Sequence, residues 1–288
     1  MHDLFIAPFA DFAFMRRALV GAVALSLSGA PLGVFLILRR MSLSGDAMAH
    51  AILPGAAIGY LVAGLSLPAM TIGGLAAGLV VAFGAGLAAR ATSLREDASL
   101  AAFYLVSLAL GVTLVSLRGS NIDLLHVLFG NVLALDDSAL MLLSAIASLT
   151  LLALALLYRP LVLDTVDPAF LATTTRAGSA TQIAFLGVLV LNLVAGFHAL
   201  GTLMSVGLMM LPAASARLWA RRLETTLALA ALFAVLAAYI GLVASYRLAT
   251  PSGPSIVLAA GAIYFLSLIF GASGGALRHF APRRHLEA

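Results

Sequence analysis

Long apolar stretches separated by short polar junctions run along most of the chain. A transmembrane helix needs about 20 apolar residues to cross the hydrocarbon core of a bilayer. Stretches of about that length lie near residues 18–38, 46–64, 69–89, 99–117, 139–157, 181–199, 200–219, 225–245 and 255–273. The division at Gly196 to Gly201 is the least distinct, so the pattern predicts an all-α, polytopic bundle of eight or nine transmembrane helices.

The composition also indicates an integral membrane protein. Hydrophobic residues make up 62% of the 288 residues and charged residues 10%, whereas an ordinary soluble domain is about 25% charged. The first apolar run, Ala18 to Leu38, is too long for a cleavable signal and ends in Arg39 and Arg40, so we expect it to stay as a span. No soluble domain interrupts the stretches, which indicates a single transmembrane domain over residues 1–288.

The arginines predict the orientation, because basic residues in short loops are retained on the cytoplasmic side during insertion. If the junction after the first span is cytoplasmic, twelve of the sixteen basic residues lie on that side. The other four are Arg16, Arg17, Arg118 and Arg247. We therefore expect the N-terminus outside and the C-terminus in the cytoplasm. Because the arginines lie at the ends of apolar segments and not in one patch, the net charge of +4 does not indicate a nucleic-acid partner.

Two residue types are missing from the chain, and their absence excludes several functions. There is no cysteine, and all sixteen basic residues are arginine. Thiolate nucleophiles and cysteine zinc sites are excluded, and so are phosphate-binding loops and Schiff-base enzymes, which need a lysine. A metal ion would have to be held by nitrogen and oxygen atoms, and a separate protein would have to hydrolyse any ATP.

The start of the second apolar stretch carries the clearest candidate for chemistry. Asp46 and His50 are four residues apart and share one face of the predicted helix. Ionisable residues inside a span are costly and functional by default, although Asp46 could instead cap the helix. Pro54 removes the hydrogen bond to the carbonyl of His50. This position can therefore offer an imidazole and a freed backbone oxygen beside a carboxylate.

One aspartate and one histidine suit zinc, manganese or ferrous iron better than calcium or magnesium. Two ligands are too few for a tight site, and a second copy of the chain facing the first would double them. A transporter needs such weak, exchangeable binding. A metallohydrolase needs a third protein ligand and a bound water, so we do not expect an enzyme.

Other candidate residues are weaker. Asp123 and His126 lie three apart in a short outer stretch and form a rival pair for metal binding or docking, although side chains of a wetted loop explain them as well. His198 lies near the outer end of a span, where an interfacial role is simpler. Pro212 is expected to interrupt its span as Pro54 does.

The cytoplasmic stretch from Asp164 to Gly178 has helix signals of its own. Asp167 can cap a helix, and Pro168 suits the first helical position because its missing N–H would be unpaired there. We expect a short helix from Pro168 to about Arg176 that ends near Gly178.

The run from Arg39 to Gly55, with the core Gly45-Asp-x-x-x-His-x-x-x-Pro54, resembles the signature of the membrane permease subunits of bacterial zinc, manganese and iron ABC importers. Further similar segments are Glu96-Asp97, Leu128 to Asn131, Asp164 to Gly178, Leu211 to Arg217 and Pro251 to Gly253. The resemblance therefore covers nearly the whole chain.

The resemblance implies a homodimer of permeases in the bacterial inner membrane, a cytoplasmic ATPase that uses the ATP, and an extracytoplasmic metal-binding protein. Asp46 and His50 correspond to transient ligands of the transported zinc or manganese, with iron as a further candidate and no permanently bound cofactor. The ATPase-coupling element corresponds to residues 164–178, with the contact at Asp164, Asp167, Pro168, Phe170 and Gly178. The alternative is an ion- or proton-coupled secondary metal transporter in which Asp46 carries a proton.

Overall fold

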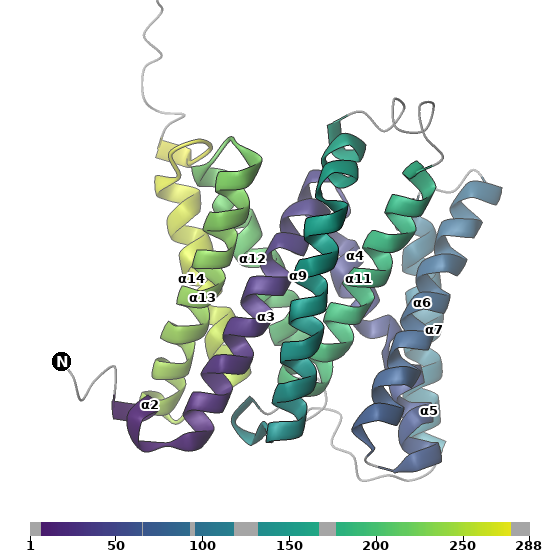
Figure 1. Cartoon of the computed structure of the whole chain (residues 1–288), viewed down its shortest axis with the longest axis horizontal. Helices are drawn as coiled ribbons and strands as arrows, with labels where there is room; N and C mark the ends of the chain where they lie inside the picture. The colour runs from purple at the N-terminus through teal and green to yellow at the C-terminus, as the bar shows by residue number, and fades with distance from the viewer. Residues whose placement is uncertain (1–6, 65, 93–95, 118–131, 167–176, 278–288) are drawn as a thin grey trace, which may run out of the picture.

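The structure, a computed structural model, describes residues 7–64, 66–92, 96–117, 132–166 and 177–277 (Figure 1). These residues form helices and no strand, so the predicted all-α fold is confirmed for the described part of the chain. The elements are α2 (Ala7–Asp11), α3 (Ala13–Leu38), α4 (Ser42–Ala51), α5 (Leu53–Ala63), α6 (Leu67–Ala91), α7 (Glu96–Leu117), the 3-10 helix η1 (Val132–Ala134), α9 (Asp137–Val166), α11 (Ala177–Leu200), α12 (Thr202–Trp219), α13 (Leu223–Leu248) and α14 (Ser252–Phe270).

Seven helical segments of the described chain are long and apolar enough to cross a membrane. They are Ala13–Leu38, Ser42–Ala63, Leu67–Ala89, Asp137–Val166, Ala180–Phe197, Leu223–Leu248 and Ser252–Phe270. The apolar part of α7, Ala98–Leu114, is shorter, and α12 is not among the seven. Length and composition alone therefore support seven spans, fewer than the eight or nine expected.

The least distinct boundary in the sequence is a break between two helices. α11 ends at Leu200, and Gly201 has a φ of 86°, a backbone conformation that glycine adopts without a steric penalty. α12 begins at the next residue. The stretches 181–199 and 200–219 are therefore separate helices.

The segment 164–178, expected to be a loop with a short helix, starts and ends inside longer helices. α9 continues to Val166, which places Asp164 in its last turn. Gly178 lies in the first turn of α11 and does not end a helix there. The expected helix from Pro168 to Arg176 lies outside the described residues.

Helices α3 and α9 run parallel and are joined at both ends. At the N-terminal ends, Arg17 Nε lies 2.8 Å from Asp137 Oδ1, and both side chains are exposed. At the C-terminal ends, Arg39 forms a largely buried ion pair with Asp164 and lies over the Phe185 ring, 4.7 Å from its centroid. This second pair explains why α9 stays helical beyond its predicted end.

A side-chain cap fixes the start of α9. The carboxylate of Asp136 accepts the N–H of Ala139 at 2.7 Å and the hydroxyl of Ser138 at 2.9 Å. These two hydrogen bonds favour the charged carboxylate, so they hold the pKa of Asp136 below its ordinary value of 3.8.

Close packing of small residues organises the bundle. α13 and α14 lie on one side of α3, and α5, α6 and α7 lie on the other (Figure 1). α5 and α6 approach most closely: a Cβ at Gly55 would lie 1.9 Å from the carbonyl oxygen of Gly73, and one at Gly59 would lie 2.5 Å from that of Ala69. Such approaches hold helices together in lipid, so Gly55, Gly59 and Gly73 serve helix packing.

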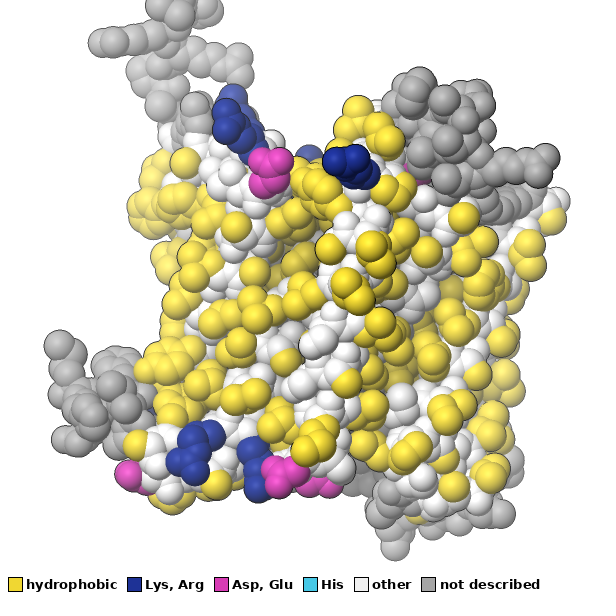
Figure 2. Space-filling model, viewed as in Figure 1, with side chains coloured by type: hydrophobic (Ala, Val, Ile, Leu, Met, Phe, Trp, Pro, Cys, Tyr) yellow, Lys and Arg dark blue, Asp and Glu magenta, His cyan; other side chains and the backbone are white. Residues whose placement is uncertain are grey.

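The surface of the molecule fits a bilayer. Figure 2 shows apolar side chains over the middle of one face, with Arg, Asp and Glu at its two ends. α2 and the C-terminal end of α14 also lie at opposite ends of the bundle (Figure 1). The described chain therefore passes from one end of the bundle to the other between α2 and the end of α14.

Candidate metal site at a broken helix

The second span consists of two helices. α4 ends at Ala51 and α5 begins at Leu53, with Pro54 in the first turn of α5. The break expected from Pro54 is confirmed. Pro212, in contrast, lies buried inside α12, which is continuous, so the expected interruption of that helix does not occur. A proline can stay inside a membrane helix when neighbouring helices surround it, and α12 packs against α3, α13 and α14.

Two backbone carbonyls at the break are engaged by hydrogen-bond donors. In an unbroken helix the carbonyl of Ala51 would accept the N–H four residues later. Here it accepts a hydrogen bond from the hydroxyl of Ser107 on α7, at 3.0 Å. The carbonyl of His50, which we expected to be free, accepts the N–H of Ile52. The site therefore offers side-chain atoms rather than a free backbone oxygen.

Asp46 and His50 share one face of α4, as their spacing predicts. His50 Nε2 lies 3.7 Å from Asp46 Oδ1, too far for a hydrogen bond but within the separation of two ligands that each lie about 2.1 Å from one metal ion. The side chain of Asp46 is 61% exposed and that of His50 25%. Among the described residues no cluster of three His, Asp or Glu is present, so the structure gives this pair no third ligand of these types within the described part of the chain.

Asp46 opens onto a cavity of about 140 Å³ between α4 and α7. The cavity is lined by Leu43, Ser44, Asp46, Ala47, Leu100, Ala101 and Tyr104. Tyr104 also stacks on the imidazole of His50, with ring centroids 6.5 Å apart and an interplanar angle of 29°. One aromatic residue of α7 therefore contacts both the cavity and the candidate nitrogen ligand.

Sequence reasoning did not find Tyr104 or Ser107. Both lie inside the apolar stretch 99–117, where a tyrosine and a serine are unremarkable in lipid-facing or packing positions. Their spacing, continued by Gly111, places them on one face of a helix. The pattern contains no information about which other helix that face contacts.

The remaining candidate residues do not join this site in the described structure. Asp164 is in the ion pair with Arg39, and Gly178 lies in α11. His198 also lies in α11, but its side chain is outside the described ones. The candidates outside the described residues are Asp123, His126, Asp167, Pro168 and Phe170.

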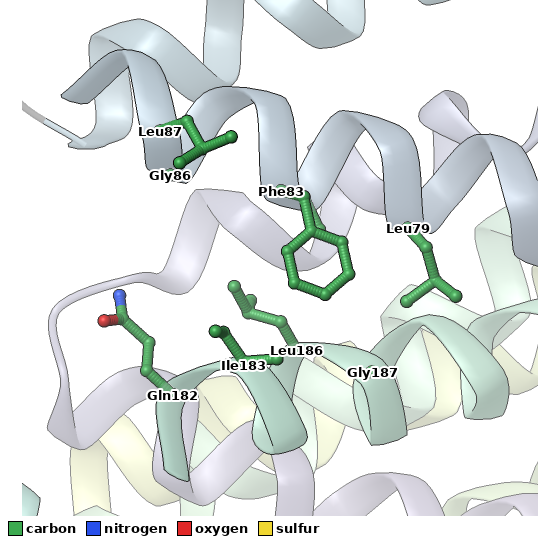
Figure 3. Close-up of a pocket in the computed structure, with 9 residues that line it drawn as sticks. Leu79, Phe83, Gly86, Leu87, Gln182, Ile183, Leu186 and Gly187 are labelled. Carbon is green, nitrogen blue, oxygen red and sulfur yellow. The ribbon is translucent and has the colours of Figure 1, made fainter. Parts of the chain in front are cut away.

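A second pocket, of about 60 Å³, lies between α6 and α11 (Figure 3). Leu79 and Phe83 of α6 face Ile183 and Leu186 of α11 across it. Its lining contains one polar side chain, Gln182, and neither a carboxylate nor an imidazole. This pocket lacks the carboxylate and imidazole ligands that a metal ion would need.

The comparison with known proteins gives matches along almost the whole chain. The ABC 3 transport family matches residues 11–271. "Manganese transport system membrane protein MntC" of Halalkalibacterium halodurans is 34% identical over 282 residues, which cover 96% of this chain and 94% of that protein. "Chelated iron transport system membrane protein YfeD" of Yersinia pestis is 28% identical over 270 residues, which cover 94% of this chain and 89% of that protein.

A solved structure agrees with these matches. A chain of PsaBC from Streptococcus pneumoniae, in complex with a Fab, has a TM-score of 0.85 and 28% sequence identity. The superposition covers 97% of this chain and 100% of that chain. The fold, the family match and the Gly45-to-Pro54 motif agree: the chain belongs to the ABC 3 transport family, as a membrane permease subunit of a bacterial metal-ion ABC importer.

Proposed function

We propose that this permease imports manganese and that Asp46 and His50 bind the ion transiently during its passage. The observation that carries the proposal is the 3.7 Å separation of His50 Nε2 and Asp46 Oδ1 beside the helix break. A carboxylate and an imidazole suit manganese, iron and zinc. The name of the relative MntC favours manganese, that of YfeD makes iron the second candidate, and zinc is the third.

Two copies of the chain would complete the site. The side chain of Asp46 is 61% exposed, and Leu43, one turn earlier on α4, is 77% exposed. This face of α4 is therefore uncovered in a single chain. A carboxylate that faces lipid is costly, and two ligands hold a metal ion only weakly. A second permease packed on this face would cover the carboxylate and could bring two further ligands.

We infer one transmembrane domain with nine crossings, in which α7 and α12 join the seven long apolar segments. An odd number is supported by the positions of α2 and the C-terminal end of α14 at opposite ends of the bundle (Figure 1). The excess of arginine at the C-terminal ends of α3 and α12 supports an external N-terminus and a cytoplasmic C-terminus. Because α4 starts at the cytoplasmic side in this orientation, Asp46 would lie in the cytoplasmic half of the membrane.

The partner ATPase would act through the segment 164–178. We assign its contact to Asp164, Asp167, Pro168, Phe170 and Gly178. Asp164 is joined to Arg39, and α4, which carries Asp46, begins three residues after Arg39. This ion pair supports a mechanical connection from the ATPase to the metal ligands. An extracytoplasmic binding protein would deliver the ion at the opposite side.

Uptake by vesicles containing the permease and its ATPase, with the metal-binding protein added outside, tests the proposal. Manganese, iron and zinc are compared in parallel, for the wild-type protein and for the Asp46→Asn, Asp46→Ala and His50→Ala variants. We expect ATP-dependent uptake of manganese that all three variants lose while they still insert and bind the ATPase. An Asp137→Asn variant, altered at an exposed carboxylate of α9, is the matched control and should keep its uptake.

Two results would overturn the proposal. Full uptake by both Asp46→Ala and His50→Ala would remove these residues from the path of the ion. Uptake without ATPase, driven by a proton gradient, would favour the secondary transporter, in which Asp46 carries a proton.

A further inference from the structure

One face of α7 follows the break between α4 and α5. Tyr104, Ser107 and Gly111 recur at intervals of three and four residues, so they lie on the same side of that helix. Each of the three contacts a different part of the broken span. α7 as a whole packs against both α4 and α5.

Ser107 supplies a hydrogen-bond donor to a carbonyl at the C-terminal end of α4. The last carbonyls of a helix have no partner within it, and a carbonyl without a partner in the membrane interior is costly. The hydroxyl of Ser107, itself only 6% exposed, donates to the carbonyl of Ala51 at 3.0 Å. The bond joins residues 56 positions apart in the sequence. It stabilises the broken form of the span and not a continuous helix.

Gly111 and Tyr104 act on either side of that hydrogen bond. A Cβ at Gly111 would lie 3.0 Å from the backbone nitrogen of Pro54, so the glycine lets α7 approach the start of α5. The Tyr104 ring stacks on the His50 imidazole, with the two ring centroids 6.5 Å apart, and Tyr104 also lines the cavity that Asp46 lines. The same face of α7 therefore touches the break, one ligand and the space beside the other.

We propose that Ser107 and Tyr104 are positioning residues for the metal ligands: Ser107 holds the helix break, and the ring of Tyr104 sets the orientation of the His50 imidazole. The inference rests on the proposed roles of Asp46 and His50. Neither positioning residue needs to touch the ion. An imidazole that a ring fixes in one orientation loses less freedom when it binds a metal, so loss of either contact weakens binding more than it slows transport.

The test uses the assembled transporter in vesicles and measures manganese uptake over a range of manganese concentrations. Ser107→Ala should raise the half-saturating manganese concentration about tenfold and change the maximal rate by less than about twofold. Tyr104→Ala should do the same, whereas Tyr104→Phe, which keeps the ring and loses the hydroxyl, should behave like the wild-type protein.

Ser99 provides the matched control on the same helix. It is 2% exposed, and its hydroxyl donates to the carbonyl of Ala85 on α6 at 2.8 Å. α6 is continuous at Ala85, so this bond stabilises no break. Ser99→Ala should therefore lose a comparable buried hydrogen bond without a change in the half-saturating concentration.

The inference is wrong if Ser107→Ala and Ser99→Ala have the same half-saturating concentration, or if Tyr104→Phe is as impaired as Tyr104→Ala. If Ser107→Ala does not fold, the difference in half-saturating concentration between Tyr104→Ala and Tyr104→Phe tests the inference. Asp46→Ala and His50→Ala are measured beside them. If those two retain uptake, the proposed function fails. If they lose it while the Ser107 and Tyr104 variants match wild type, only the positioning roles fail.

Discussion

Of the described membrane spans that contain an internal proline, α3, α9 and α12 continue through Pro31, Pro160 and Pro212, and the second span does not continue through Pro54. At Pro54 the span divides into α4 and α5, whereas α12 continues through Pro212. The neighbours differ. Beside Pro54, the carbonyl of Ala51 has a donor in Ser107 on another helix. Around Pro212, α12 is held between three helices. A proline alone therefore does not dictate a break, and the break at Pro54 coincides with a hydrogen-bond donor from another helix for the carbonyl of Ala51.

The two regions also touch each other. A Cβ at Gly33 of α3 would lie 2.0 Å from the carbonyl oxygen of Met209 on α12, and a Cβ at Gly45 of α4 would lie 2.6 Å from the Cε of Met209. Met209 is 1% exposed. The continuous helix is thus packed against α4, the half of the broken span that carries the proposed metal ligands. We interpret the continuous helix α12 as a packing support for α4.

The largest loss of stability and uptake is expected from a substitution where α5 packs on α6. In Gly55→Ala, the new methyl would lie 1.9 Å from a backbone carbonyl of Gly73, and backbone cannot move aside as a flexible side chain can. We expect the free energy of unfolding to fall by at least about 1–3 kcal/mol and uptake to be lost. Thermal unfolding in detergent and manganese uptake measure the two effects.

Gly86→Ala on α6 is the control for that substitution, because a Cβ at Gly86 would meet nothing within 4 Å. The alanine should stabilise the helix by up to about 1 kcal/mol and leave uptake unchanged. Equal losses in both variants would show that the close approach at Gly55 has no special importance.

Pro54→Ala should separate stability from function. The alanine supplies an N–H for the carbonyl of His50, and proline inside a helix costs about 3 kcal/mol relative to alanine, so the variant favours a continuous span. We expect unchanged or higher stability together with about a tenfold loss in manganese uptake, equivalent to about 1.4 kcal/mol. A variant that unfolds more easily and transports normally would contradict the functional role of the break.

Pro212→Ala is the corresponding change in the continuous helix. Because α12 has no break to lose, uptake should stay within about twofold of wild type, and the free energy of unfolding should change by no more than about 1–2 kcal/mol. The same uptake and unfolding measurements apply. A loss of uptake as large as that of Pro54→Ala would mean that both prolines serve the transport cycle.

Local sequence rules predicted most of the helices of this architecture but not the contacts between them. Apolar length predicted the helices, and the spacing of Asp46 and His50 predicted their shared face. The same proline rule, however, predicted interruptions at Pro54 and Pro212, and only one occurs. Ser107 contacts Ala51 across 56 residues of sequence. Such a pairing depends on how the helices pack, so no pattern within one stretch could reveal it.

The smallest loss of stability is expected from a substitution where α4 packs on α12. In Gly45→Ala, the new methyl would meet the Cε of Met209 at 2.6 Å, and this flexible side-chain end can move away. We expect a loss of stability below about 1.5 kcal/mol and near-normal uptake.

Met209→Leu removes the Cε atom that the new methyl would meet and keeps a similar side-chain volume. The free energy of unfolding of the Gly45→Ala/Met209→Leu double variant should therefore exceed the value predicted by adding the two single changes, by about 0.5 kcal/mol or more. Unfolding in detergent of the wild type, both single variants and the double variant measures this coupling. Strict additivity would show that α4 does not pack on α12 through this pair, and the support assigned to the continuous helix would then have to come from Gly33 and α3 alone.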